Sequence, residues 1–90
     1  MSLEDVSRVD AVTVRDGWAV LAIHHFDVWE PLDALREALE WKIATAQGHV
    51  TTGAFLERYH RLPARIELHA TEAPPPEIEG VCRRYGVRIA

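Results

Sequence analysis

Two short runs rich in β-branched and aromatic residues, 9–14 and 18–26, lie on either side of Asp16-Gly17. An Asp-Gly pair between two such runs predicts a β-hairpin, because a type I′ turn needs a positive φ at both of its central residues. With this pair as the loop, Val12 lies opposite Leu21. We expect that face of the hairpin to point toward the core.

The opposite face of the hairpin is also apolar. On the second run it carries Trp18, Val20, Ala22, His24 and Phe26. A sheet face that meets only water is rarely this apolar, so we expect something to cover it. The candidates are a second copy packed sheet to sheet, a different protein, and the loop 56–63 of the same chain.

The segment that follows has helical periodicity. Pro31 suits the first position of a helix, because its missing N–H would have no partner there. Apolar residues then recur at spacings of three and four, which directs one stripe toward the sheet. The stripe consists of Leu32, Leu35, Leu39, Ile43, Ala46 and Val50. It predicts one long helix that continues through Gly48 to Thr52, with Gly53 ending it in a left-handed conformation. A short helical turn is expected around 55–59.

The last third of the chain predicts a strand, a helix and a strand. Residues 65–71 alternate between polar and apolar, which indicates a strand with one buried face and with Glu67 and His69 on the other. Apolar spacing in 78–85 indicates a second helix, which Gly86 closes before a last strand. The predicted order is β-β-α-β-α-β. The fold class is α+β, a two-layer sandwich with helices on one face of a four-stranded sheet.

Composition narrows the classes of partner. The chain has 90 residues, 48% hydrophobic and 27% charged, and we expect a single domain over 1–90. A net charge of -4 is unlike the clustered Lys and Arg of a nucleic-acid-binding protein. No apolar run reaches the roughly 18 residues of a membrane span. These two observations predict that neither nucleic acid nor a membrane is a partner. Cys82 has no second cysteine to pair with, so we expect a buried thiol in a cytoplasmic protein.

Histidine and carboxylate residues are the candidates for catalysis or metal binding. His24, Glu67 and His69 would share the outer sheet face if the second and third strands are neighbours, which supports an alternative hypothesis of a small enzyme or metal-dependent binder. A second candidate set lies at the strand-to-helix corner: His25, Asp27 and Trp29. The spacings of known metal sites, nucleophile elbows and phosphate loops are absent from the sequence. We therefore predict no catalytic residue, no cofactor and no metal.

Five segments form a pattern along the chain to about residue 71. They are Val9-Asp10-Ala11-Val12, Asp16-Gly17, His25-Phe26-Asp27-Val28-Trp29, the Leu-rich helix leading to Lys42-Ile43, and Gly53 with Phe55-Leu56. This pattern resembles a family of small uncharacterised bacterial proteins, a domain of unknown function. The resemblance implies the same order of elements and no mechanism. Family members have a polar Asn and an aromatic residue where this chain has Ala44 and Ala46, and its second helix is short for the family, so no role is transferred to that helix face.

The three tryptophans differ in their expected surroundings. Trp29 at the corner is expected to pack in the core. Trp41 is expected at the edge of the helical stripe, and it is also a candidate for the solvent side of the helix. Trp18 lies beside the hairpin turn on the outer face, where exposed aromatic rings are typical of interfaces. We expect an interaction module that forms a homodimer, or binds another protein such as a toxin in an immunity-like role. The expected interface residues are Trp18, Val20, Ala22, His24, Phe26 and His69.

Overall fold

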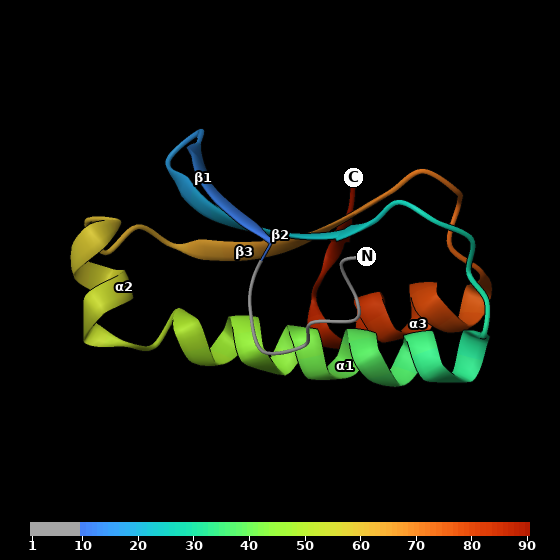
Figure 1. Cartoon of the computed structure of the whole chain (residues 1–90). Helices are drawn as coiled ribbons and strands as arrows, with labels where there is room; N and C mark the ends of the chain where they lie inside the picture. The colour runs from blue at the N-terminus through green and yellow to red at the C-terminus, as the bar shows by residue number, and fades with distance from the viewer. Residues whose placement is uncertain (1–9) are drawn as a thin grey trace.

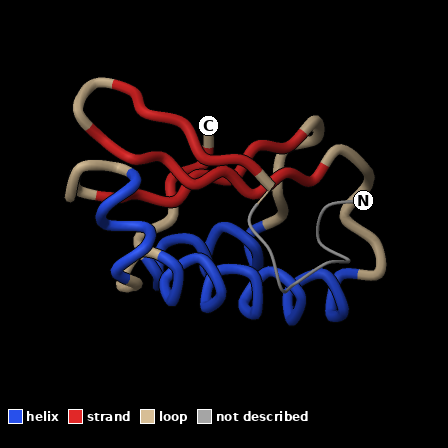
Figure 2. The backbone as a smooth tube through the Cα atoms, turned by 60° about the vertical axis from the view of Figure 1, so that its left-hand side comes forward, coloured by secondary structure: helices blue, strands red, loops and turns tan. Residues whose placement is uncertain are grey.

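The computed structural model describes residues 10–90, which form one sheet and three helices (Figure 1). In chain order the elements are β1 (Ala11–Arg15), β2 (Trp18–His25), α1 (Leu32–His49), α2 (Gly53–Arg58), β3 (Ala64–Ala70), α3 (Pro76–Tyr85) and β4 (Arg88–Ile89). The strand order is β1-β2-β3-β4, with β1 antiparallel to β2 and the other neighbours parallel. Figure 2 shows the sheet as one layer and the helices as the other. The α+β sandwich and its β-β-α-β-α-β order are thus confirmed, with α2 as the expected short helical turn.

Positive backbone φ angles fix two chain reversals. Asp16 has φ 53° and Gly17 has φ 80°, as a type I′ turn requires. Val12 pairs with Leu21, so the predicted hairpin register is confirmed. At the end of α3, Gly86 adopts the left-handed conformation with φ 70°, where a side chain would be strained.

The core lies between the sheet and helices α1 and α3, which pack side by side along one sheet face (Figure 1). Leu21 and Ile23 of β2 and Leu68 of β3 are fully buried there. The helices contribute Leu39, Ile43, Ala46, Ile78, Val81 and Cys82. The buried thiol predicted for Cys82 is confirmed.

Helix α1 ends earlier than its apolar stripe predicts. It stops at His49, and the Thr52 hydroxyl then caps the next helix by accepting a hydrogen bond from the Phe55 N–H at 3.2 Å. Gly53 is the first residue of α2, and the prediction that it ends α1 in a left-handed conformation is wrong. The cause is local, because a Thr side chain that satisfies a free helical N–H favours starting a new helix. The placement of Gly48 inside a helix is confirmed.

The two tryptophans assigned to the core have different outcomes. Trp29 is 8% exposed, and its indole N–H donates to the Glu72 carbonyl at 3.0 Å. Trp41 is 61% exposed, so its assignment to the core edge is wrong and its placement on the solvent side of the helix is confirmed. At about 100° per residue, Trp41 lies about 200° around α1 from the buried Leu39, on the helix face away from the sheet.

A buried lysine links the start of β1 to α1, a contact that the apolar pattern does not predict. The Lys42 side chain is fully buried, with its Nζ 3.3 Å from Asp10 Oδ1. Asp10 Oδ2 also accepts a hydrogen bond from the His24 backbone N–H at 2.9 Å. Since burial of a charge is costly unless the charge is paired, the Asp10 carboxylate stabilises the Lys42 ammonium where it enters the core.

Candidate interaction surface

The sheet face turned away from the helices, here called the outer face, combines side chains from every strand. Because side chains alternate along a strand, the strand registers determine which residues share this face. They are Ala11, Thr13, Arg15, Trp18, Val20, Ala22, His24, Arg65, Glu67, His69 and Arg88. Phe26 follows β2 directly and stacks on His24 with 4.9 Å between ring centroids, which extends the face by one aromatic ring.

Four of the six expected interface residues are accessible on the outer face. Trp18 is 37% exposed and Phe26 is 59% exposed. His24 and His69 are half-buried and meet edge to face, with ring centroids 5.7 Å apart. The face therefore presents aromatic rings at both ends of β2 and a histidine pair near one end.

The other two expected interface residues, Val20 and Ala22, are already buried within the chain at 3% and 8% exposure. The registers place Val20 between Thr13 and Arg65 and place Ala22 beside Glu67. Larger side chains on the same face thus exclude water from these small apolar ones. Val20 and Ala22 therefore need no second copy to exclude water from them, and their place in an interface stays a prediction.

Glu67 is the centre of a polar cluster on the outer face. Arg15 Nη2 donates to Glu67 Oε2 at 2.5 Å, and His69 Nε2 lies 3.1 Å from Glu67 Oε1. Arg65 Nε is 3.9 Å from the same carboxylate. Burial opposes ionisation of Glu67, but the hydrogen bonds and charges of Arg15 and His69 outweigh it and hold the pKa of Glu67 below its ordinary value.

Arginine exceeds carboxylate on this face, although the chain as a whole has a net charge of -4. Arg15 and Arg65 form ion pairs with Glu67, and Arg88 is the register partner of Glu67 on β4. Arg65 stacks over Trp18 at 5.0 Å, and its Nε is buried without a hydrogen-bond partner among residues 10–90. Within the same described range Arg88 has no ion-pair partner.

The three arginines were not among the predicted site residues. The alternation of 65–71 contained the signal for Arg65, because it puts Arg65 on the same face as Glu67. Arg88 had no such signal, since β4 spans two residues and joins the face only through its pairing with β3.

The residues of the enzyme or metal-binding hypothesis are brought together in part. β2 and β3 are neighbours, which places His24, Glu67 and His69 on the same face as that hypothesis requires. Across residues 10–90, no group of three His, Cys, Asp or Glu side chains is arranged to hold a metal ion. The corner residues have structural contacts, because His25 Nε2 is 2.8 Å from the Val28 carbonyl and the His25 ring lies 4.1 Å from the Trp29 ring.

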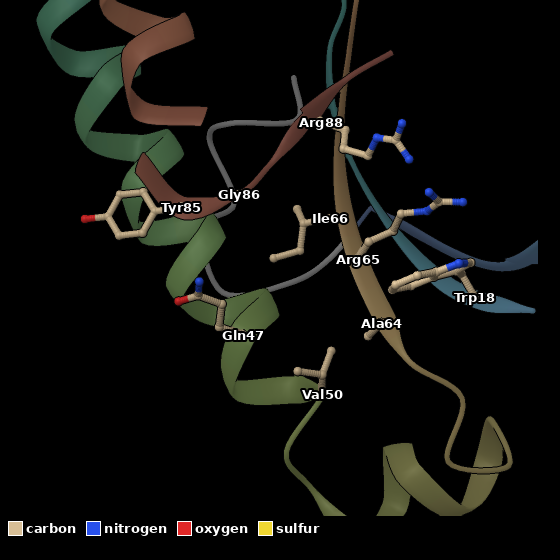
Figure 3. Close-up of a pocket in the computed structure, with 9 residues that line it drawn as sticks. All are labelled: Trp18, Gln47, Val50, Ala64, Arg65, Ile66, Tyr85, Gly86 and Arg88. Atoms are coloured by element: carbon tan, nitrogen blue, oxygen red, sulfur yellow. The ribbon is translucent and has the colours of Figure 1, made fainter. Parts of the chain in front are cut away.

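A cavity of about 450 Å³ adjoins the outer face at the free edge of β3 (Figure 3). Trp18, Arg65 and Arg88 form its rim on the outer side of the sheet. Val50 and Ile66 lie on the helix side. The cavity thus joins an apolar interior to the positive charges of Arg65 and Arg88, of which Arg65 pairs with Glu67 at 3.9 Å.

Comparisons with known proteins add no relative. No protein-family model, no curated protein and no solved structure matches the chain. The resemblance to a family of small uncharacterised bacterial proteins therefore stays a prediction. Among the described helices, none has both the length and the apolar character to cross a membrane. The observations define a two-layer α+β protein with an arginine-rich sheet face and exposed aromatic rings at both ends of β2.

Proposed function

We propose that the protein is an interaction module that self-associates by packing the outer face of one copy on the outer face of another. The observation that supports this most is the position of the exposed rings. Trp18 and Phe26 are four residues before and four residues after Ala22, at opposite ends of β2 and roughly 26 Å apart along an extended chain. Large aromatic side chains are the residues that most often anchor interfaces.

A two-fold axis that lies between the two sheets, parallel to them, and passes over Ala22 at a right angle to β2 would place Trp18 of one copy beside Phe26 of the second. The same operation would place Phe26 beside Trp18, which is the reciprocal pairing of a closed symmetric dimer. Ala22 lies at the axis, where its small side chain permits close approach of the two sheets.

Two charges lie at the level of the axis, because Glu67 and Arg88 both belong to the register row of Ala22, and each would face the same residue of the second copy. Glu67 is paired with Arg15 and Arg65 within its own copy, so the repulsion between the two Arg88 side chains is the larger one. Two like charges that face each other across an interface repel, and this repulsion weakens as salt is added. The proposed dimer should therefore become tighter when Arg88 is neutralised by Arg88→Gln.

Analytical ultracentrifugation or light scattering at high micromolar concentration tests the proposal. Trp18→Ser and Phe26→Ser should each weaken the dimer about tenfold or more, because each removes a ring from both halves of the interface. Trp41→Ser is the matched control, since it removes an exposed ring from the far side of α1. Val20 is unsuitable as a probe, because a charge at a 3% exposed position tests the fold instead of the interface.

Two outcomes contradict the proposal. One is a wild-type protein that stays monomeric at high micromolar concentration. The other is a dimer that Trp41→Ser weakens as much as Trp18→Ser and Phe26→Ser do, which would place the contact on the helix layer.

A further inference from the structure

Among residues 10–90, no strand pairs with the outer edge of β3 along Ala64–Ile66. β4 pairs with β3 at Glu67 and Leu68 only, because the chain leaves α3 at Gly86 and reaches β3 two residues later, at Arg88. The residues Ala64–Ile66 are hydrogen-bonded to β2 on one side and adjoin the cavity on the other. Exposed strand edges of this kind are where extended peptides add to sheets.

The ladder geometry identifies the free backbone groups of this edge. Ala19 N–H donates to the Pro63 carbonyl and Thr71 N–H donates to the His25 carbonyl, so the odd-numbered residues of this segment face β2. Even-numbered residues of β3 must then face away from β2. Ala90 N–H donates to the Leu68 carbonyl on that side, as this alternation requires.

By the same alternation, the Ala64 carbonyl and the Ile66 N–H point into the cavity. Neither has a hydrogen-bond partner among residues 10–90. A backbone carbonyl and an N–H two residues apart are the pair that one residue of an added strand can satisfy.

The rim of the cavity carries two positive charges, those of Arg65 and Arg88. Figure 3 shows the guanidinium groups of Arg65 and Arg88 projecting side by side on the same side of β3 as Trp18. Arg65 Nε is buried and lacks a hydrogen bond, and Arg88 lacks an ion pair, within the part of the chain that the structure describes. Two neighbouring guanidinium groups favour a carboxylate, which can accept hydrogen bonds from both.

We propose that the free edge of β3 binds an extended peptide that carries an acidic side chain. The residue opposite Arg65 would donate its N–H to the Ala64 carbonyl and accept a hydrogen bond from the Ile66 N–H. Its carboxylate would lie on the outer side, against Arg65 and Arg88. The residues before and after it would point the opposite way, into the apolar part of the cavity at Val50 and Ile66, so the recognised pattern is apolar, acidic, apolar.

This binding site goes beyond the proposed dimer and does not depend on it. The edge groups of Ala64 and Ile66 are available in a single copy. Phe26 lies at the far end of β2 and does not line the cavity. The variant Phe26→Ser therefore separates the two proposals: it should weaken the dimer and leave peptide binding unchanged.

The probe is an acetylated and amidated pentapeptide, Thr-Val-Glu-Val-Thr, added to isotope-labelled protein in an NMR titration. We expect saturable shifts of the Ala64, Arg65 and Ile66 amides. Replacing the peptide's Glu by Gln should weaken binding about tenfold, because the charge-assisted hydrogen bonds are lost. Methylating the backbone nitrogen of that Glu should abolish binding while keeping the carboxylate, because the donor to the Ala64 carbonyl is removed.

Protein variants provide the second half of the test. Arg88→Gln should lower the affinity for the pentapeptide about tenfold. Arg84→Gln, which removes an exposed arginine of α3, should leave this affinity unchanged. No shifts up to the solubility limit, or equal binding of the N-methylated peptide, would overturn strand addition. Equal affinity for free acetate would also overturn it, by showing that the arginines take a simple anion without the edge.

Discussion

Removing the charge of Glu67 is the most direct test of how the outer face is held together. The substitution Glu67→Gln keeps the size of the side chain and one acceptor oxygen, and it removes the carboxylate that Arg15, Arg65 and His69 surround. The side chain of Glu67 is 7% exposed, so the lost interactions lie in a site that water reaches poorly. Hydrogen bonds to a charged group contribute about 1.5–3 kcal/mol each in such sites.

The expected loss of stability is smaller than the sum of these hydrogen-bond contributions. The Arg15 side chain is 49% exposed, so water screens its attraction to Glu67 and can replace the lost hydrogen bond. Arg65 is held at 3.9 Å, beyond hydrogen-bond distance. We therefore expect Glu67→Gln to lower the free energy of unfolding by about 1–2 kcal/mol at neutral pH, measured by urea melts with fluorescence detection.

The pH dependence separates charge from packing. Because the folded-state pKa of Glu67 lies below its ordinary value of 4.5, its ionised form stabilises the fold above that pH, and this stability is lost as the pH falls through the folded-state pKa. The difference between wild type and Glu67→Gln should therefore shrink on acidification from about pH 7 toward about pH 3. Glu40→Gln is the control, since Glu40 pairs at 3.6 Å with a 66% exposed Arg84, and should cost little at any pH. A difference for Glu67→Gln that stays constant or grows at low pH would refute the electrostatic account.

Two further predictions concern the helices. Gly48→Ala should stabilise the protein by about 0.5–1 kcal/mol, since Gly48 is helical and an added Cβ would meet open space. Gly53→Ala should be neutral or mildly stabilising, because Gly53 begins α2. If urea melts show that Gly53→Ala destabilises the protein, this assignment is contradicted. Burial raises the pKa of Cys82 to about 11, with the Glu79 charge adding to the shift, so a thiol reagent at neutral pH should modify the native protein only as fast as it unfolds. Fast labelling without added denaturant would show that α3 opens locally.

The elements predicted well from the sequence are those fixed by local chemistry. The turn at Asp16-Gly17 and the left-handed Gly86 each require one backbone conformation, and few other residues adopt it readily. The end of α1 was missed for a related reason. The apolar stripe continues to Val50, but the short-range bond from the Thr52 hydroxyl to the next helix decides where the chain breaks.

The outer face illustrates what a strand pattern can and cannot predict. Period-two alternation correctly assigns Val20 and Ala22 to this face, because orientation depends only on the backbone. Their burial depends on the length of the side chains beside them, and those belong to β1 and β3, which become neighbours only when the sheet forms. The charge of the face has the same origin, since Arg15, Arg65 and Arg88 are far apart in the sequence and meet around Glu67 through strand order alone. An acidic chain can in this way carry a locally basic surface, and the binding chemistry follows the local charge.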